Sequence, residues 1–274
     1  MSRGGMRLAD KRVLVTGAGG ILGSRFADAV LSEGGKIVLA EVNSERLKEI
    51  HEQMTARHKK ENILAISCDC GNEEEVVRAF AKVEKDFGGV DVVINNATAP
   101  IKNPKEFFAN LTDFSLEEWR RQNSVNLDAC FLVAREAVKS FLKKKDGSGG
   151  SLIQMSSVMG VMGHDKRIYK NALYEGNAIN TPVAYSTAKA GVLGLMRWIA
   201  VEYADKKIRS NAIAPGGIFS GQNDEFVDRY SARVPMGRMG RDTEITGALL
   251  YLASDEASYM TGQCLLVDGG LGAW

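Results

Sequence analysis

Residues 12–23 read RVLVTGAGGILG, a short apolar run followed by a cluster of glycines. The apolar part, residues 12–16, has the length of one buried β-strand, and residues 21–33 have the pattern of a helix. Glycines between a strand and a helix let the backbone turn tightly and approach a pyrophosphate at the helix N-terminus. The stretch predicts the first strand–loop–helix unit of a nucleotide-binding α/β sheet, although similar loops also occur without a ligand.

The rest of the chain repeats this alternation of apolar strands and helices. Further strands are expected at residues 36–40, 63–68, 90–94, 151–155, 208–213 and 264–267, and further helices at 44–58, 73–87, 116–145, 184–204 and 244–252. Continuous apolar strands separated by helices indicate an α/β fold with a parallel sheet covered on both faces. No linker or composition shift divides the chain, so we expect one domain over residues 1–274. Irregular stretches at about 98–115, 158–181 and 216–236 are expected to be substrate loops.

The composition excludes several classes of function. The chain has 274 residues, of which 45% are hydrophobic and 25% are charged, and its net charge is +1. This balance gives no electrostatic case for binding nucleic acid or a membrane surface. No apolar run is long enough to span a bilayer. Residues 1–7 lack the apolar core of a secretory signal, so a cytoplasmic protein is expected.

The cysteines and histidines do not form a metal-binding pattern. Cys68 and Cys70 are separated by one residue, which is not a zinc spacing, and Cys130 and Cys264 lie far from them in the sequence. The three histidines are scattered. We therefore expect free, mostly buried thiols and no metal site.

Glu41 follows the second expected strand. An acidic side chain at this place can accept hydrogen bonds from both ribose hydroxyls of a dinucleotide, and it repels a 2′-phosphate. Its neighbours Ala40, Val42 and Asn43 are not basic, and Gly20 leaves the glycine loop without a cation. This pattern favours NAD over NADP, unless Glu41 is an ordinary surface residue at a strand end.

Polar residues also follow the next two expected strands. Asp69 follows the third strand, where it could bind the adenine amino group, and Asn95, Asn96 and Ala97 follow the fourth. The carboxyl ends of parallel strands form the edge at which α/β sheets bind their ligands, so these residues are candidate cofactor contacts.

Tyr185 and Lys189 lie four residues apart in the expected helix 184–204. Four residues make about one helical turn, so the phenol and the ammonium share a face. A nearby ammonium favours the phenolate form of a tyrosine, which can then exchange a proton with an alcohol or a carbonyl. The pair alone could equally be a surface contact, so its meaning depends on the other motifs.

Five motifs occur in an order that resembles the short-chain dehydrogenase/reductase family, from about Leu8 to Gly270. They are the glycine loop, Asn95-Asn96-Ala97, Ser156-Ser157 after the fifth expected strand, Tyr185 with Lys189, and Pro215-Gly216 after the sixth. The resemblance implies a Rossmann-like, doubly wound parallel sheet in three layers. It also implies a homotetramer or homodimer that uses NAD or NADP to interconvert a secondary alcohol and a ketone.

The resemblance implies roles for particular residues. Tyr185 matches the catalytic acid/base, Lys189 its activator and a ribose ligand, and Ser157 the residue that holds the substrate oxygen. Asn126 matches the asparagine that anchors a water relay to the lysine, and Pro215 begins the turn that binds nicotinamide. The expected cofactor contacts are Gly17, Gly19, Gly20, Ile21, Leu22, Gly23, Glu41, Asp69, Cys70, Asn96, Ala97, Tyr185, Lys189, Pro215, Gly216, Ile218 and Ser220.

The chain departs from the family pattern at three places. Ile21 stands where the family has its second glycine, and Thr98 stands where the family has the glycine of Asn-Asn-Ala-Gly. Tyr185 follows Ser157 by 28 positions, which is markedly longer than the usual interval. We therefore expect altered packing of the glycine loop, a side chain near the nicotinamide cleft and an inserted loop before Tyr185.

The inserted loop suggests the kind of substrate. Lys166, Arg167 and Lys170 are expected over the cleft, and residues 102–105 add two more lysines. These cations could bind a phosphate or carboxylate, or they could be solvated loop charges or part of a subunit contact. We expect a polar substrate, sugar-like or anionic, such as a sugar phosphate. The loop, with residues 214–219 and 267–270, also resembles more weakly the family branch found in bacterial surface-glycan and flagellin-modification pathways.

Alternatives stay open at this point. Within the same family, the chain could be a 3-oxoacyl thioester reductase or a polyol or gluconate-type dehydrogenase. In a different class, it could be a non-catalytic protein that senses NAD and regulates a partner, since a fold does not set a function. Such a protein would be expected to lose the tyrosine or the lysine. Both Tyr185 and Lys189 are present, so an enzyme is expected.

Overall fold

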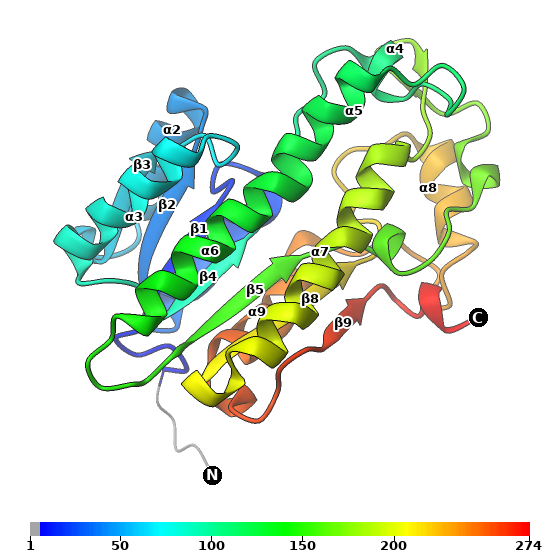
Figure 1. Cartoon of the computed structure of the whole chain (residues 1–274). Helices are drawn as coiled ribbons and strands as arrows, with labels where there is room; N and C mark the ends of the chain where they lie inside the picture. The colour runs from blue at the N-terminus through cyan, green and yellow to red at the C-terminus, as the bar shows by residue number, and fades with distance from the viewer. Residues whose placement is uncertain (1–5) are drawn as a thin grey trace.

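Seven parallel strands form one central sheet in the computed structural model, which describes residues 6–274 (Figure 1). The strands are β1 (Arg12–Thr16), β2 (Lys36–Glu41), β3 (Ile63–Ser67), β4 (Val92–Asn95), β5 (Gly150–Met155), β8 (Ile208–Pro215) and β9 (Cys264–Val267). Their order is β3-β2-β1-β4-β5-β8-β9. The order reverses between β1 and β4, and open α/β sheets bind ligands at such a switch point, beyond the carboxyl ends of the strands.

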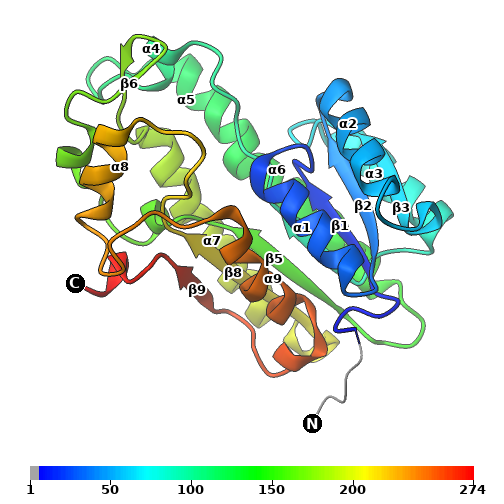
Figure 2. The same cartoon turned by 180° about the vertical axis from the view of Figure 1, so that it is seen from behind.

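Helices cover both faces of the sheet and complete three layers (Figure 2). One hydrophobic core is formed with buried side chains of α1 (Ile21–Ser32), α2 (Ser44–Thr55) and α9 (Thr246–Ala253). The other is formed with those of α3 (Glu73–Phe87), α6 (Ala129–Leu142) and α7 (Val183–Glu202). Val13 and Val15 of β1 lie in the first core and Leu14 in the second, as the alternation of a strand requires. The expected Rossmann-like, doubly wound α/β fold is confirmed.

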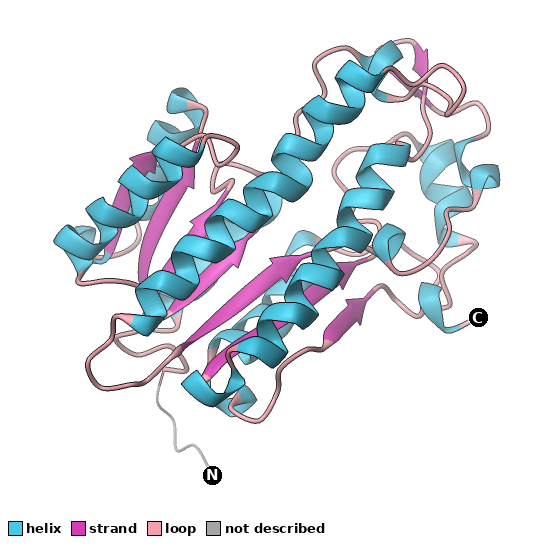
Figure 3. Ribbon diagram, in the orientation of Figure 1, coloured by secondary structure: helices cyan, strands magenta, loops and turns pink. Residues whose placement is uncertain are grey.

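Several elements differ from the expectations. The expected helix 116–145 is divided into α5 (Leu116–Asn123) and α6 by a π-helical turn, Ser124–Asp128. The stretches expected to be irregular contain α4 (Pro104–Phe107), the hairpin of β6 (Leu173–Tyr174) and β7 (Asn177–Ala178), and α8 (Asp224–Ser231). These pieces gather at one end of the molecule, beyond the carboxyl ends of β5 and β8 (Figures 1 and 3).

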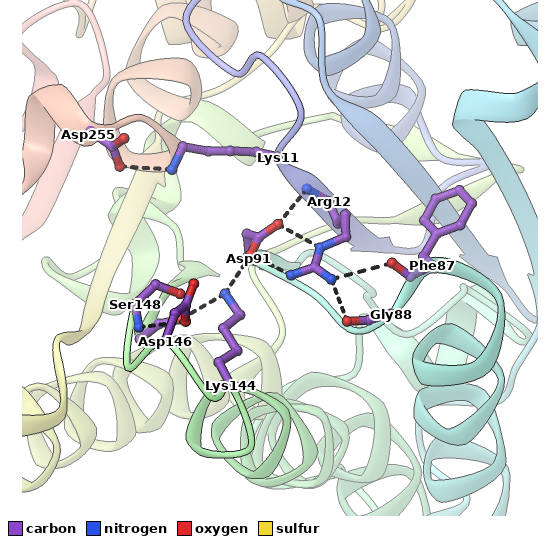
Figure 4. Close-up of polar contacts among 10 residues, drawn as sticks. Lys11, Arg12, Phe87, Gly88, Asp91, Lys144, Asp146, Ser148 and Asp255 are labelled. Atoms are coloured by element: carbon purple, nitrogen blue, oxygen red, sulfur yellow. Dashed lines mark hydrogen bonds and ion pairs between the residues drawn. The ribbon is translucent and has the colours of Figure 1, made fainter.

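Asp91 lies at the opposite end of the sheet, where β1 and β4 begin (Figure 4). Its carboxylate accepts hydrogen bonds from the backbone N–H of Arg12 (2.9 Å), from Arg12 Nε (2.8 Å) and from Lys144 Nζ. Burial acts to raise the pKa of Asp91, but the hydrogen bonds from Arg12 and Lys144 outweigh it and hold that pKa well below its usual range. This ion cluster stabilises the fold at the end away from the ligand-binding edge.

Most of residues 1–7, for which no secretory signal is expected, lies outside the described residues. Within residues 6–274, no helix has the length and apolar character needed to cross a membrane. The same residues contain no group of three or more His, Cys, Asp or Glu side chains arranged to hold a metal ion. We infer from the continuous sheet that these residues form one domain.

Candidate active site

The glycine loop packs tightly against the segment that follows β4. Gly17 has a φ of +64°, and a Cβ atom there would lie 3.0 Å from the Cα atom of Ala97. A Cβ atom on Gly23 would lie 2.2 Å from the carbonyl oxygen of Gly17, so glycine is required at both positions. Thr16 Oγ1 accepts hydrogen bonds from the backbone N–H groups of Asn96 (2.9 Å) and Ala97 (3.0 Å), which joins the two segments.

The N-terminus of α1 is suited to binding a phosphate. Gly20 is the N-cap residue, and no side chain of the described chain caps this end of the helix. Ile21, which replaces a family glycine, is 53% exposed and does not fill the loop, whereas Leu22 packs against the core. The close-packed glycines and the uncapped backbone N–H groups therefore fit the pyrophosphate of a dinucleotide.

Glu41, at the end of β2, is buried against the glycine loop. Its Oε2 accepts a hydrogen bond from the backbone N–H of Gly19 (3.0 Å), and its Oε1 accepts one from the N–H of Asn43 (3.1 Å). Arg46 also lies beside this loop, since a Cβ atom on Gly19 would be 2.8 Å from the Cβ atom of Arg46. Sequence reasoning missed this cation because only the first turn of α2 brings it back toward Glu41. The Asn43 N-cap was the signal that could have placed it.

The segment after β3 places Asp69 and Cys70 differently. Asp69 is exposed, and its Oδ1 accepts a hydrogen bond from the backbone N–H of Gly71 (2.9 Å). The Cys70 side chain is buried in the core, and a hydrogen bond with Cys68 together with burial raises the pKa of the Cys70 thiol. The Cys70 thiol is thus a core group, and the expected cofactor contact of Cys70 stays a prediction. All four cysteines are free, as expected, and Cys264 is only half-buried.

Tyr185 and Lys189 share a face of α7, as their spacing predicts. Lys189 Nζ is 5.6 Å from the centre of the Tyr185 ring and donates a hydrogen bond to the carbonyl oxygen of Met155 (2.8 Å). Lys189 is only 3% exposed, so water screens its charge weakly. Ser156 Oγ donates to the carbonyl oxygen of Lys189 (2.8 Å), which ties this turn of α7 to the end of β5.

Ser157 lies in the same small region, directly after Ser156. It is buried, and its Oγ accepts a hydrogen bond from the backbone N–H of Met159 (3.2 Å) at the start of a 3₁₀ turn, Val158–Gly160. This contact leaves the hydroxyl hydrogen available for another oxygen. The turn approaches α7 closely, because a Cβ atom on Gly160 would lie 2.6 Å from the carbonyl oxygen of Lys189.

Asn126 lies in the π turn between α5 and α6 and is buried. Its Oδ1 accepts hydrogen bonds from Thr98 Oγ1 and from the backbone N–H of Ala99, each over 2.9 Å. Its Nδ2 has no hydrogen-bond partner within residues 6–274. The N–H of Ala129 donates to the carbonyl oxygen of Ser124, a π-helical pattern that interrupts the α-helical hydrogen bonds of the expected helical region.

The turn after Pro215 closes the same edge of the sheet. The backbone N–H of Gly217 donates to the hydroxyl of Tyr230, and a Cβ atom on Gly217 would lie 2.5 Å from the Tyr230 ring. Ser220 is exposed, and its Oγ accepts a hydrogen bond from Gln222 Nε2 (3.1 Å). A pocket of about 420 Å³ backs this turn, but Ser157, Tyr185 and Lys189 do not line it. Its lining includes Gly216, Ile218, Arg238, Glu244 and Asp268.

The basic side chains of the inserted loop are exposed rather than gathered at the candidate catalytic residues. Lys166 and Lys170 are exposed, and Arg167 forms an ion pair with Asp165 over 2.6 Å. The lysines of residues 102–105 are exposed as well. Within the described chain, no hydrogen bond or ion pair joins any of these cations to Ser157 or Tyr185. The expected anion site over the cleft stays a prediction.

Tyr169 and Thr181 are two hydroxyl-bearing residues of the inserted loop that contact each other. The Tyr169 hydroxyl lies 2.7 Å from Thr181 Oγ1, which also donates to the sulfur of Met159 (3.9 Å). Burial raises the pKa of Tyr169, and the nearby Tyr185 adds to this rise. Thr181 directly precedes the Pro182 N-cap of α7, the helix that carries Tyr185.

The sheet, the glycine loop and the cluster of Ser157, Tyr185 and Lys189 define a nicotinamide-dependent oxidoreductase. A family model described as "Enoyl-(Acyl carrier protein) reductase" matches residues 17–272. The chain is 33% identical to "Glucose 1-dehydrogenase" of Gluconobacter oxydans (strain 621H), over 97% of this chain and 93% of that protein. It is 28% identical to the 3-oxoacyl-(acyl-carrier-protein) reductase FabG of Aquifex aeolicus (strain VF5), over 97% of this chain and 99% of the relative.

A solved structure extends these similarities to three dimensions. The short chain dehydrogenase from Leptospira borgpetersenii serovar Hardjo-bovis (strain JB197) with bound NAD⁺ has a TM-score of 0.82 to this chain at 29% identity. The match covers 99% of this chain and 96% of that chain. The protein therefore belongs to the short-chain dehydrogenase/reductase family.

Proposed function

We propose that this protein is an NAD-dependent dehydrogenase that interconverts a secondary alcohol and its ketone, with Tyr185 as the acid/base. The observation that carries the proposal is the position of Lys189, whose buried Nζ lies 5.6 Å from the centre of the Tyr185 ring. Ser157 lies beside the same turn of α7 and keeps a hydroxyl hydrogen to donate. A phenol, a buried cation and a hydroxyl in one place are the groups that proton exchange with an alcohol needs.

In the oxidation direction, the Tyr185 phenolate accepts the proton of the substrate hydroxyl. Ser157 donates a hydrogen bond to the same oxygen and orients the carbon that loses its hydrogen. The positive charge of Lys189 stabilises the phenolate. Nicotinamide, when bound, accepts the hydride from that carbon. In the reduction direction, Tyr185 returns the proton to the carbonyl oxygen.

The preference for NAD rests on Glu41. Its carboxylate, held by the N–H groups of Gly19 and Asn43, has lone pairs left for ribose hydroxyls, and its charge repels a 2′-phosphate. Arg46 favours NADP instead, because its exposed cation attracts a 2′-phosphate. Glu41 is the group bonded directly to the loop backbone, so we infer that NAD is used in preference to NADP.

The substrate is inferred to be a neutral polyol or sugar. Arg167 of the inserted loop is already paired with Asp165, whereas Tyr169 and Thr181 bring two hydroxyls together just before α7, the helix that carries Tyr185. Protein hydroxyls can bind further hydroxyls of a substrate by hydrogen bonds. The similarity to glucose 1-dehydrogenase supports this class. A phosphorylated or activated sugar of a surface-glycan pathway stays a prediction.

The second candidate function is reduction of a 3-oxoacyl thioester, which the similarity to the Aquifex aeolicus reductase favours. Initial rates with NAD and a panel of sugars, sugar phosphates and polyols separate the two, when compared with rates on acetoacetyl-coenzyme A and NADH or NADPH. Turnover of a sugar or polyol that is lost in Tyr185→Phe supports the first function. Turnover of the thioester alone supports the second, and NAD binding without any turnover supports a regulatory protein.

We also infer that copies of the chain associate into a homodimer or homotetramer. Phe131 of α6 and Trp198 and Val201 of α7 are 49%, 60% and 83% exposed. These helices lie on the same face of the sheet (Figure 1), and exposed apolar side chains favour association. Light scattering on the purified protein measures the mass of the assembly. Trp198→Glu is expected to lower that mass, because it places a charge on the exposed apolar face.

A further inference from the structure

A hydrogen bond between Thr98 and Asn126 joins the segment after β4 to the π turn. Thr98 Oγ1 and the backbone N–H of Ala99 both donate to Asn126 Oδ1, each over 2.9 Å. Because a backbone N–H can only donate, the Asn126 atom that faces it must be the amide oxygen. The two donors therefore fix the direction in which the Asn126 side-chain amide is turned.

The amide nitrogen of Asn126 is consequently held in one place inside the protein. Asn126 is 1% exposed, and its Nδ2 has no hydrogen-bond partner among the residues that the structure describes. Native proteins usually satisfy a buried donor of this kind with an ordered water or a bound group. The position of the Asn126 amide nitrogen therefore determines which oxygen, of an ordered water or a bound group, can accept its hydrogen bond.

The π turn that carries Asn126 contacts the helix that carries Lys189. The π turn packs on α7 two residues after Lys189, since a Cβ atom on Gly191 would lie 3.1 Å from the Leu127 side chain. Cys130, one turn after Asn126, donates from its thiol to the Asn126 carbonyl oxygen over 3.4 Å. The Lys189 ammonium is near enough to Cys130 to oppose the rise that burial causes in the pKa of that thiol.

We propose that Thr98 is a positioning residue, whose hydroxyl holds the Asn126 side chain and thereby the π turn that packs on α7 two residues after Lys189. The proposal rests on the function proposed above and adds a residue to its site. Thr98 acts through Asn126, not on the reacting atoms. A glycine, which stands at this position in the family pattern, has no hydroxyl and would leave the Ala99 N–H as the remaining donor to Asn126 Oδ1.

Three substitutions at Thr98 distinguish the effect of its hydroxyl from the effect of its side-chain volume. Thr98→Val keeps the shape and removes the hydroxyl, Thr98→Ser keeps the hydroxyl, and Thr98→Gly restores the family pattern. For Thr98→Val and Thr98→Gly, we expect kcat to fall about tenfold, which is the effect of one hydrogen bond. The pH profile of kcat is expected to shift, because the π turn that packs on α7 two residues after Lys189 moves. KM and the NAD dissociation constant should stay within about twofold of the parent protein. Thr98→Ser should restore the parent profile.

A second readout does not depend on activity. Hydrogen–deuterium exchange followed by mass spectrometry should show faster exchange of the π turn, residues 124–128, in Thr98→Val and parent-like exchange in Thr98→Ser. If no alcohol is turned over, the proposed function fails, and this exchange still decides the role of Thr98. Identical exchange and pH profiles in Thr98→Val and the parent would overturn the proposal. An equal loss of kcat in Thr98→Ser and Thr98→Val would also overturn it, and so would a change that is confined to KM.

Discussion

The buried ammonium of Lys189 lies 5.6 Å from the centre of the Tyr185 ring and donates a hydrogen bond to the carbonyl oxygen of Met155. The carbonyl oxygen comes from the last residue of β5, so the sheet itself sets where the charge lies. This hydrogen bond holds the cation beside the Tyr185 ring. This relationship makes Lys189 the first residue to test.

Lys189→Met is expected to lower kcat by about 10²–10³-fold, because the phenolate loses its stabilising charge. Steady-state rates of NAD reduction with the best alcohol measure the effect. Lys206→Met is the matched control, since Lys206 is an exposed lysine after the same helix and pairs with Asp205. A loss of the same size in both variants would show that the effect is general and not due to the site.

Glu41→Ala should weaken NAD binding by about tenfold and should narrow the preference for NAD over NADP. In the proposed function the carboxylate accepts hydrogen bonds from ribose and repels a 2′-phosphate, and its removal leaves the Arg46 side chain beside the loop. The ratio of kcat/KM for the two cofactors measures this. An unchanged ratio would contradict the assignment of Glu41, and the double variant Glu41→Ala with Arg46→Ala tests whether Arg46 then binds NADP.

Tyr169→Phe should lower kcat/KM about tenfold for a substrate with a second hydroxyl and leave a mono-alcohol unaffected. Butane-2,3-diol and butan-2-ol are a suitable pair, because they differ by one hydroxyl. Tyr259→Phe is the control, since Tyr259 is fully exposed. Equal loss on both alcohols would show that Tyr169 holds the loop and does not recognise substrate.

Asp91→Asn is expected to lower the free energy of unfolding by about 2–3 kcal/mol at neutral pH, because two cations lose their partner. Its folded-state pKa lies below the ordinary value, so the stabilisation is present above about pH 4 and is lost as the pH falls. Urea unfolding at several pH values measures this, and the variant should depend less on acid than the parent does. Asp205→Asn is the control, because Asp205 forms an exposed ion pair with Lys206, and it should change the free energy of unfolding little. Equal acid dependence in Asp91→Asn and the parent would contradict this role.

The sheet could be predicted almost completely from the sequence, because buried parallel strands are continuous apolar runs. Only the ends of the strands differ from the prediction. For example, β8 extends through Pro215 because residues of β9 pair with it. The Tyr185 and Lys189 pair was also predictable, since four residues on a helix fix their relative position.

The parts that sequence reasoning missed depend on contacts between distant segments. The π turn at Asn126 forms where Thr98 and Ala99, from another strand end, bind its side chain. Arg46 reaches the glycine loop only through the turn of α2. The ion pair of Arg167 with Asp165 could not be predicted, because composition does not reveal which charges of the inserted loop are paired. The short helix α8 had a readable signal in its N-cap, Asn223, which accepts a hydrogen bond from the N–H of Phe226.

The most direct test of the account is the turnover of Tyr185→Phe. The variant keeps the ring beside Lys189 and loses only the hydroxyl, so NAD should bind with a dissociation constant within about threefold of the parent value, as measured by fluorescence titration. The rate of NAD reduction with an alcohol that the parent oxidises should fall by at least about 10³-fold. Near-normal turnover of Tyr185→Phe would contradict the assignment of Tyr185 as the acid/base.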